Sequence, residues 1–164
     1  MTIVRMVLAI ALVLGAAGCS SKFKKYDGPE VTHVVVQKSQ RRMYLLHDGE
    51  ILKNYRIDLG FDPAGDKRIE GDGKTPEGVY SIDRRNPDSE FHLSLGISYP
   101  NRADVEEALA LGKSPGGDIF IHGQPRRWRA TGRDWTWGCI AVDNGEIEEI
   151  YSMVRDGTPI IINP

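Results

Sequence analysis

The feature that most constrains the fold is a series of short apolar segments, rich in β-branched and aromatic residues and separated by turn residues. Such segments favour β-strands. Between two of them, the pair Asp48-Gly49 lies where a two-residue hairpin turn requires positive φ. The predicted strand regions are 31–37, 41–60, 79–82, 118–123 and 158–163. The sequence therefore predicts a mainly β fold.

Two short helices complete the expected architecture. One is expected after Asp104, with Gly112 as its end, and the other after Asp143, where Glu146 completes a capping box and Gly157 ends the helix. The remainder of 84–118 is irregular and is interpreted as an insert over the sheet. At 164 residues with 40% hydrophobic content, the chain is long enough for one domain.

The first residues have the pattern of a secretory signal. Arg5 precedes an apolar run over residues 6–14, which is too short for a bilayer core that requires about 20 residues. The small residues that follow lead to Cys19, and this arrangement resembles the cleavage and lipidation box of bacterial lipoproteins. A plain signal cleaved near Ala17 is the alternative.

The lipoprotein interpretation divides the chain into three parts. We expect a signal peptide over 1–18, a lipid-anchored tether over 19–29 and one catalytic domain over 30–164. Ser20 after the lipidated cysteine resembles the sorting signal for the periplasmic face of the outer membrane. Membrane attachment would then come from the lipid chains on Cys19.

The charge pattern excludes one class of partner. The formal net charge is −2, and no stripe of Lys and Arg interleaved with aromatic residues is present. Nucleic-acid binding is therefore not expected. The histidines at 33, 47 and 92 lack the spacing of metal ligands, so no metal site is predicted.

Cys139 is the candidate nucleophile. It becomes the single thiol of the mature chain if Cys19 is lipidated, and a lone thiol without a disulfide partner favours a chemical role. A thiol nucleophile requires a base, and His122 at the end of a predicted buried strand is the candidate. Gly138 permits a tight turn, from which its N–H and that of Cys139 could donate to an oxyanion. We also expect a following helix N-terminus to lower the thiol pKa.

Three segments together carry a family resemblance. TPEGVYSI, DIFIHG and TWGCIAV, in this order, resemble the L,D-transpeptidase (YkuD-type) catalytic domain of bacterial cell-wall enzymes, over about residues 32–164. The resemblance implies a β-sandwich-like catalytic domain that uses no metal or organic cofactor. It implies Cys139 as nucleophile, His122 as general base, Gly123 as the carbonyl that orients the imidazole, and Gly138 with Cys139 as oxyanion donors. Peptidoglycan stem peptides are the implied substrates, and carbapenems are expected to acylate the cysteine.

Two positions depart from the family pattern. Trp137 stands where the family often has histidine, and Ala141 where it often has arginine. Trp137 either stacks on substrate or packs under its own loop. The further substrate-binding candidates are Thr136, Tyr99 and Arg133, the last with a solvated loop face as its alternative.

The expected activity is transfer of a stem-peptide acyl group from Cys139 to an amine, with release of a terminal D-amino acid. Hydrolysis by the same acyl-enzyme, as a carboxypeptidase or an amidase, is the second hypothesis. A non-catalytic wall-binding lipoprotein is the third. The segments 84–118 and 124–137 are long enough to act as lids, and Trp135 and Trp137 are large enough to exclude water from the thioester.

Overall fold

A computed structural model of the chain describes residues 21–127 and 130–164. The predictions for the signal peptide and for lipidation of Cys19 lie outside these residues. Within the described ranges, no helix has the length and apolar character needed to cross a membrane.

Eight strands form one curled sheet in the order β3-β2-β1-β8-β4-β5-β6-β7. The strands are β1 (His33–Gln37), β2 (Arg42–His47), β3 (Glu50–Arg56), β4 (Gly78–Asn86), β5 (Ser94–Ile97), β6 (Phe120–His122), β7 (Ile140–Ala141) and β8 (Pro159–Asn163). The helices are α2 (Arg102–Ala110) and α3 (Asn144–Met153). Within residues 21–127 and 130–164, the prediction of a mainly β fold with two short helices is confirmed.

The sheet turns at β4, which belongs to both of its halves. The beginning of β4 pairs with β8, and its end pairs with β5 after a register shift between Ile82 and Arg84. A bulge of this kind bends a strand and increases its twist. The bend lets the half that carries β6 and β7 fold over, so that apolar side chains of both halves share one core.

The hairpin of β2 and β3 follows its sequence signature. Asp48 and Gly49 have φ values of 48° and 92°, which the tight turn requires. In β2, Met43 and Leu45 are fully buried and alternate with more exposed residues, as expected of a strand with one face on the core. The predicted hairpin turn is confirmed.

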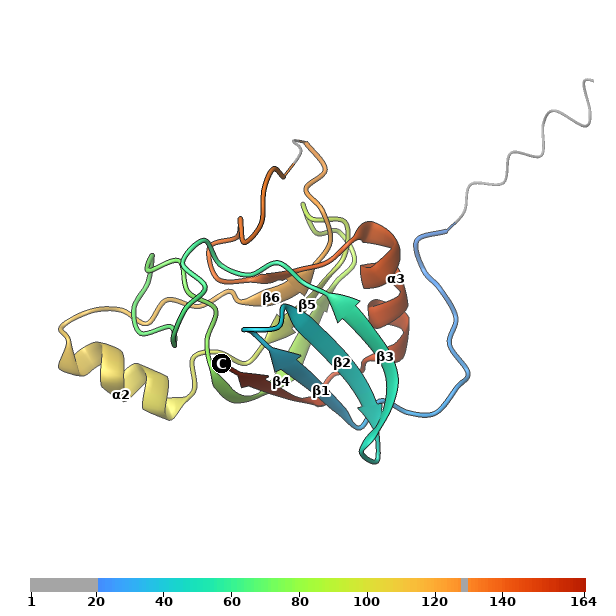
Figure 1. Cartoon of the computed structure of the whole chain (residues 1–164), viewed down its shortest axis with the longest axis horizontal. Coiled ribbons are helices and arrows are strands. Elements are labelled where there is room, and N and C mark those ends of the chain that lie inside the picture. The colour runs from blue at the N-terminus through green and yellow to red at the C-terminus, as the bar shows by residue number, and fades with distance from the viewer. Residues whose placement is uncertain (1–20, 128–129) are drawn as a thin grey trace, which may run out of the picture.

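The two helices have different surroundings (Figure 1). Helix α3 packs beside the sheet, with Ile147, Ile150 and Met153 buried, whereas α2 projects at the opposite end of the molecule. The predicted start of α2 was wrong, because Asn101 is its N-cap and Asp104 is the third helical residue of the capping box. Helix α3 starts after Asp143 as predicted, but it ends at Met153, before Gly157.

The interpretation of 84–118 as an insert over the sheet was wrong in part. This segment contains β5, whose four residues are all buried, between β4 and β6 in the sheet. The loop between β4 and β5 (87–93) lies beside β6, because Gly123 N donates to the carbonyl of Phe91 at 3.0 Å. The strand β5 therefore brings this loop to the end of the strand that carries His122.

Candidate active site

The pairing of β6 and β7 places His122 and Cys139 on the same face of the sheet. The two strands are parallel, with Ile121 opposite Ile140 and His122 opposite Ala141. Cys139 precedes Ile140 by one residue and His122 follows Ile121 by one, so alternation directs both side chains away from the Ile pair. Both residues line a cleft of about 280 Å³. The structure therefore brings the predicted nucleophile and base together.

His122 is held as a neutral imidazole with one nitrogen fixed. Its ring is 3% exposed, and Nδ1 donates to the carbonyl oxygen of Gly123 at 2.7 Å. Burial lowers the pKa of His122 to about 4, although the bond to Gly123 opposes this shift. With the proton of the neutral ring on Nδ1, Nε2 carries the lone pair that can accept a proton.

Gly123 requires the absence of a side chain. An added Cβ would lie 2.6 Å from Asn144 Oδ1 and 3.0 Å from the carbonyl oxygen of Phe91. Any larger residue here would displace the chain that orients His122. This is a physical reason for the His-Gly pair noted in the sequence.

Cys139 rests as a thiol. Its Sγ donates to the carbonyl oxygen of Asp118 at 3.6 Å, and burial raises its pKa to about 11. The expectation of a lowered thiol pKa was wrong. The strand β7 separates Cys139 from α3, which begins at Asn144, so Cys139 does not lie at a helix N-terminus.

The turn before the nucleophile is built from Thr136 and Gly138. Gly138 has a φ of 124°, and an added Cβ would lie 2.7 Å from the carbonyl oxygen of Lys74. The hydroxyl of Thr136 donates to the carbonyl of Cys139 at 2.7 Å and accepts from the N–H of Gly138 at 3.2 Å. In this geometry, Gly138 N–H is already engaged, so the structure gives no support to its role as an oxyanion donor. Thr136 is buried beneath the turn.

A second cleft of about 470 Å³ also reaches Cys139. Trp137, Ile119 and the buried Lys67 belong to its walls. Trp137 is 72% exposed, and its ring meets that of Phe61 edge to face at 4.9 Å. Trp137 thus faces solvent rather than packing under its own loop, and its stacking on substrate stays a prediction. Cys139 lies where two clefts meet.

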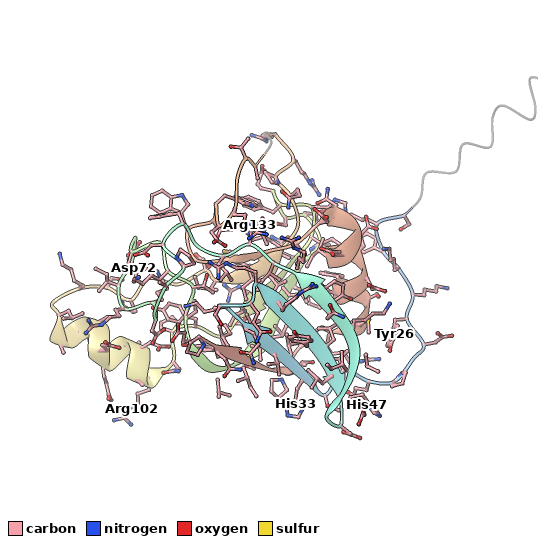
Figure 2. All side chains as sticks on the ribbon, in the orientation of Figure 1. Tyr26, His33, His47, Asp72, Arg102 and Arg133 are labelled. Atoms are coloured by element: carbon pink, nitrogen blue, oxygen red, sulfur yellow. The ribbon has the colours of Figure 1, made fainter. Side chains whose placement is uncertain are left out.

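Tyr99 and Arg133 lie outside both clefts. Tyr99 is 5% exposed, and its hydroxyl donates to the carbonyl of Pro115, so it belongs to the core. Arg133 lines a separate cleft of about 480 Å³ with Arg56 and Asp143. Arg133 lies in the loop above the sheet, whereas His33 and His47 lie at the opposite end of the strands (Figure 2). The geometry does not bring Tyr99 or Arg133 to Cys139.

The arginines after β6 bind the neighbouring loop. Arg126 donates its backbone N–H to the carbonyl of Glu90 at 3.0 Å, and Arg127 Nε lies 3.6 Å from a Glu90 carboxylate oxygen. These contacts connect the loop after β6 to the loop between β4 and β5. The side chain of Arg126 also donates, from Nη2, to the carbonyl of His92 at 3.3 Å, so both side chains are engaged in protein contacts.

Sequence reasoning missed Phe91 as a residue of the site. Its ring centroid lies 4.4 Å from that of His122, and it lines the cleft shared by His122 and Cys139. The sequence separation of Phe91 from both residues concealed this contact. Only recognition of β5 as a central strand could have indicated it.

Comparison with protein families gives the class of the protein. The family model of the L,D-transpeptidase catalytic domain (YkuD) matches residues 31–162, and the chain belongs to this family. Among individual relatives, YafK of Escherichia coli (strain K12) is 27% identical over 141 residues, which cover 82% of this chain and 52% of YafK. The chain thus spans about half the length of this curated relative.

Solved structures agree with this assignment. The helical cell shape determining protein Pgp2 of Campylobacter jejuni is 31% identical with a TM-score of 0.64, and the match covers 92% of this chain and 53% of Pgp2. Bd1075 of Bdellovibrio bacteriovorus is 25% identical with a TM-score of 0.59, over 86% of this chain and 50% of Bd1075. The curled sheet with two helices is also the fold of solved L,D-transpeptidases from Mycobacterium tuberculosis and Enterococcus faecium.

Proposed function

We propose that the chain is a cysteine-dependent L,D-transpeptidase that acts on peptidoglycan stem peptides. The observation that carries the proposal is the placement of Cys139 and His122 on one sheet face, in one cleft, with Nδ1 of His122 fixed on Gly123. Membership of the YkuD family supports the substrate class.

Acylation follows from this geometry. Sγ of Cys139 attacks the carbonyl carbon that precedes a terminal D-amino acid, while Nε2 of His122 accepts the thiol proton. The carbon–nitrogen bond then breaks, and the same proton passes from Nε2 to the leaving amine. The products of this half-reaction are a thioester on Cys139 and a free D-amino acid.

Deacylation repeats these steps with a new nucleophile. An acceptor amine attacks the thioester carbon and gives a proton to Nε2, the carbon–sulfur bond breaks, and the proton returns to Sγ. Cys139 lies at the junction of two clefts, so a donor and an acceptor peptide can approach from different sides.

Hydrolysis of the thioester is the second candidate. The large exposed fraction of Trp137 favours it, since a ring that faces solvent in the free protein shields the sulfur only when substrate or a moved loop covers it. Under this candidate the chain is an L,D-carboxypeptidase or an amidase. A role in cell shape fits either activity, because the similar protein Pgp2 is described as determining helical cell shape.

Attachment to the periplasmic face of the outer membrane through lipid on Cys19 is part of the same proposal. The support is the sequence pattern of residues 1–20. A Cys19→Ala variant is expected to leave the membrane fraction, with unchanged activity on soluble muropeptides. Its retention in the membrane fraction would contradict the lipid anchor.

The decisive experiment supplies purified protein without residues 1–18 with disaccharide tetrapeptide and follows the products by mass spectrometry. Cross-linked dimer with released D-amino acid supports transfer, and free tripeptide alone supports hydrolysis. Cys139→Ser and His122→Gln are expected to lower turnover at least about 1,000-fold while circular dichroism stays unchanged. Activity of Cys139→Ser within a few-fold of wild type would remove Cys139 from the mechanism.

Acylation by a carbapenem provides an independent probe of the nucleophile. We expect an intact-mass increase of one carbapenem molecule on the wild-type chain and none on Cys139→Ser. An adduct on both proteins would place the reaction at another residue.

A further inference from the structure

The imidazole of His122 is enclosed by two aromatic side chains from separate loops. The centroid of the Phe91 ring lies 4.4 Å from that of His122, with 34° between the planes. The Trp135 ring lies 5.6 Å from His122 at 62°, and the Phe91 and Trp135 centroids are 6.0 Å apart. The three rings therefore form one cluster, in which each contacts the other two.

Each enclosing loop is fastened to the fold by its own polar contacts. The carbonyl of Phe91 accepts from Gly123 N–H at 3.0 Å. Beside Trp135, the carboxylate of Asp134 accepts two hydrogen bonds from Nε and one from Nη2 of Arg41, and another from the N–H of Leu59. The chain that carries each ring is thus held by hydrogen bonds that do not involve the imidazole of His122.

The charged and titratable groups around the cluster have other partners. Those that line the cleft beside His122 are the thiol of Cys139, Asp118 paired with Arg84, and Glu90 paired with Arg127. On the neighbouring strands, Ser94 and Ala141 lie opposite His122, and both are uncharged. On α3, Glu148 binds His92, the residue after Phe91. Among the described residues, the imidazole therefore makes its hydrogen bond to a neutral carbonyl.

Two effects of the rings oppose one another. Contact with an aromatic face favours an imidazolium, because a cation is attracted to the face of the ring. Exclusion of water disfavours the charged form, by up to several pKa units for a fully buried group. Burial lowers the pKa of His122 to about 4, against the opposing hydrogen bond to Gly123.

We propose that Phe91 and Trp135 are positioning residues that exclude water from His122 and so hold it as the neutral base of the acyl-transfer reaction. The role of His122 as a base rests on the proposed function, whereas the enclosure of its ring does not. The rings act through His122. They leave its cleft side open toward Cys139, since His122 and Cys139 line the same cleft.

The test measures the pKa of His122 directly, by NMR titration of histidine-labelled protein. His122→Gln identifies the signal among the four histidines. In Phe91→Ala and Trp135→Ala, water reaches the ring, and the pKa is expected to rise from about 4 toward the ordinary 6.5. Phe91→Leu and Trp135→Phe restore apolar cover and are expected to remain near the wild-type value.

The matched control is Leu109→Ala, which removes an exposed apolar side chain on α2, away from His122. Its His122 signal is expected to titrate as in wild type. Trp135 is half-buried in a surface loop, so Trp135→Ala keeps the test open if Phe91→Ala does not fold. Wild-type titration of His122 in the folded alanine variants would overturn the proposal.

The activity arm separates this inference from the proposed function. If the pKa rises to about 6, kcat/KM of Trp135→Ala at pH 5 falls to about one tenth of its maximum, while wild type retains about nine tenths. If kcat/KM of the two proteins declined over the same acidic pH range, the result would count against the enclosure. If no stem peptide reacts at any pH, the proposed function fails, and the NMR titration still decides the enclosure.

Discussion

Cys139 and His122 rest as a pair of neutral groups. The pKa of the thiol is raised to about 11 and that of the imidazole is lowered to about 4, both mainly by burial. Below a pH of about 4 both groups carry their proton, and above about 11 both have lost it. Over the wide range between them, the pair holds one transferable proton. Proton transfer is therefore expected to accompany attack, rather than to precede it as in a preformed thiolate–imidazolium pair.

The buried His122 links stability to pH. The unfolded chain binds a proton on this residue near pH 6.5, whereas the folded chain does so only near 4. The stability that the neutral His122 contributes is therefore fully present above pH 6.5, and it is lost progressively as the pH falls from 6.5 to 4. Between pH 7 and 5 the loss is about 2 kcal/mol in the free energy of unfolding. Urea titrations of wild type and His122→Gln at both pH values measure it. Equal losses in the two proteins would contradict the assignment.

At the scale of elements, the turn before Cys139 depends on glycine. We expect Gly138→Ala to lower the free energy of unfolding by about 1–3 kcal/mol and to lower activity, because its Cβ would meet the carbonyl oxygen of Lys74 at 2.7 Å and its φ is 124°. Gly112→Ala is the control for φ alone, since Gly112 has a φ of 65° with open space around it. An equal effect of both changes would show that the clash has no separate cost.

Asp134 holds the part of the loop after β6 that carries Trp135. Asp134 binds Arg41 at 2.8 Å and the N–H of Leu59 at 3.0 Å. Removal of the carboxylate in Asp134→Ala releases the loop that carries Trp135, and we expect kcat/KM to fall about tenfold with a loss of about 1–3 kcal/mol in stability. Urea unfolding and steady-state kinetics measure the two effects.

Two further variants serve as controls for this prediction. Asp134→Asn keeps an acceptor for Leu59 and tolerates the φ of 51°, so its activity is expected to lie between those of wild type and alanine. Glu106→Ala breaks an exposed i,i+4 pair with Arg102 and is expected to change neither activity nor stability measurably. Unchanged kinetics of Asp134→Ala would separate the loop anchor from the chemistry.

The sequence predicted the elements whose signals are local. The Asp48-Gly49 turn and the capping box of Asp143 are short motifs, and both are present. It missed β5 because four residues buried on both faces show no alternation. It placed the start of α2 at Asp104 because Asn101 and Asp104 are both suitable N-caps, and only the backbone identifies Asn101.

The sequence also predicted only part of the candidate site. His122 and Cys139 could be named from the sequence because each belongs to a short motif. The enclosure by Phe91 and Trp135 could not, since it depends on two loops that meet only when the sheet curls. The thiol pKa was expected with the wrong sign, because the two residues of β7 that separate Cys139 from α3 have no clear strand pattern.

At the scale of the whole molecule, residues 21–26 at the start of the described chain bind to the domain surface, and this segment is called the strap. Lys22 donates to the carbonyls of Pro87 and His92, and Lys24 lies 3.4 Å from a carboxylate oxygen of Glu148 on α3. The strap therefore connects α3 with the loop that carries Phe91. Figure 1 shows this first described part of the chain beside α3.

We expect the strap to stabilise the Phe91 loop. A Lys22→Ala/Lys24→Ala double variant is expected to increase amide hydrogen exchange of residues 87–92 several-fold, because it removes the side chains that hold the loop carbonyls. Global stability is expected to change by less than about 1 kcal/mol, since these contacts are largely exposed. Lys25→Ala, an exposed neighbour, is the matched control. Unchanged exchange in the double variant would show that the loop holds its position without the strap.

The docked strap also limits the distance between Cys19 and the domain. If Cys19 carries lipid, three residue steps separate it from Lys22, the first side chain that binds the domain, and this distance spans at most about 11 Å. A free tether over 19–29 would span up to about 35 Å. The domain would then be held close to the membrane surface. It could act only on peptidoglycan strands that reach this layer.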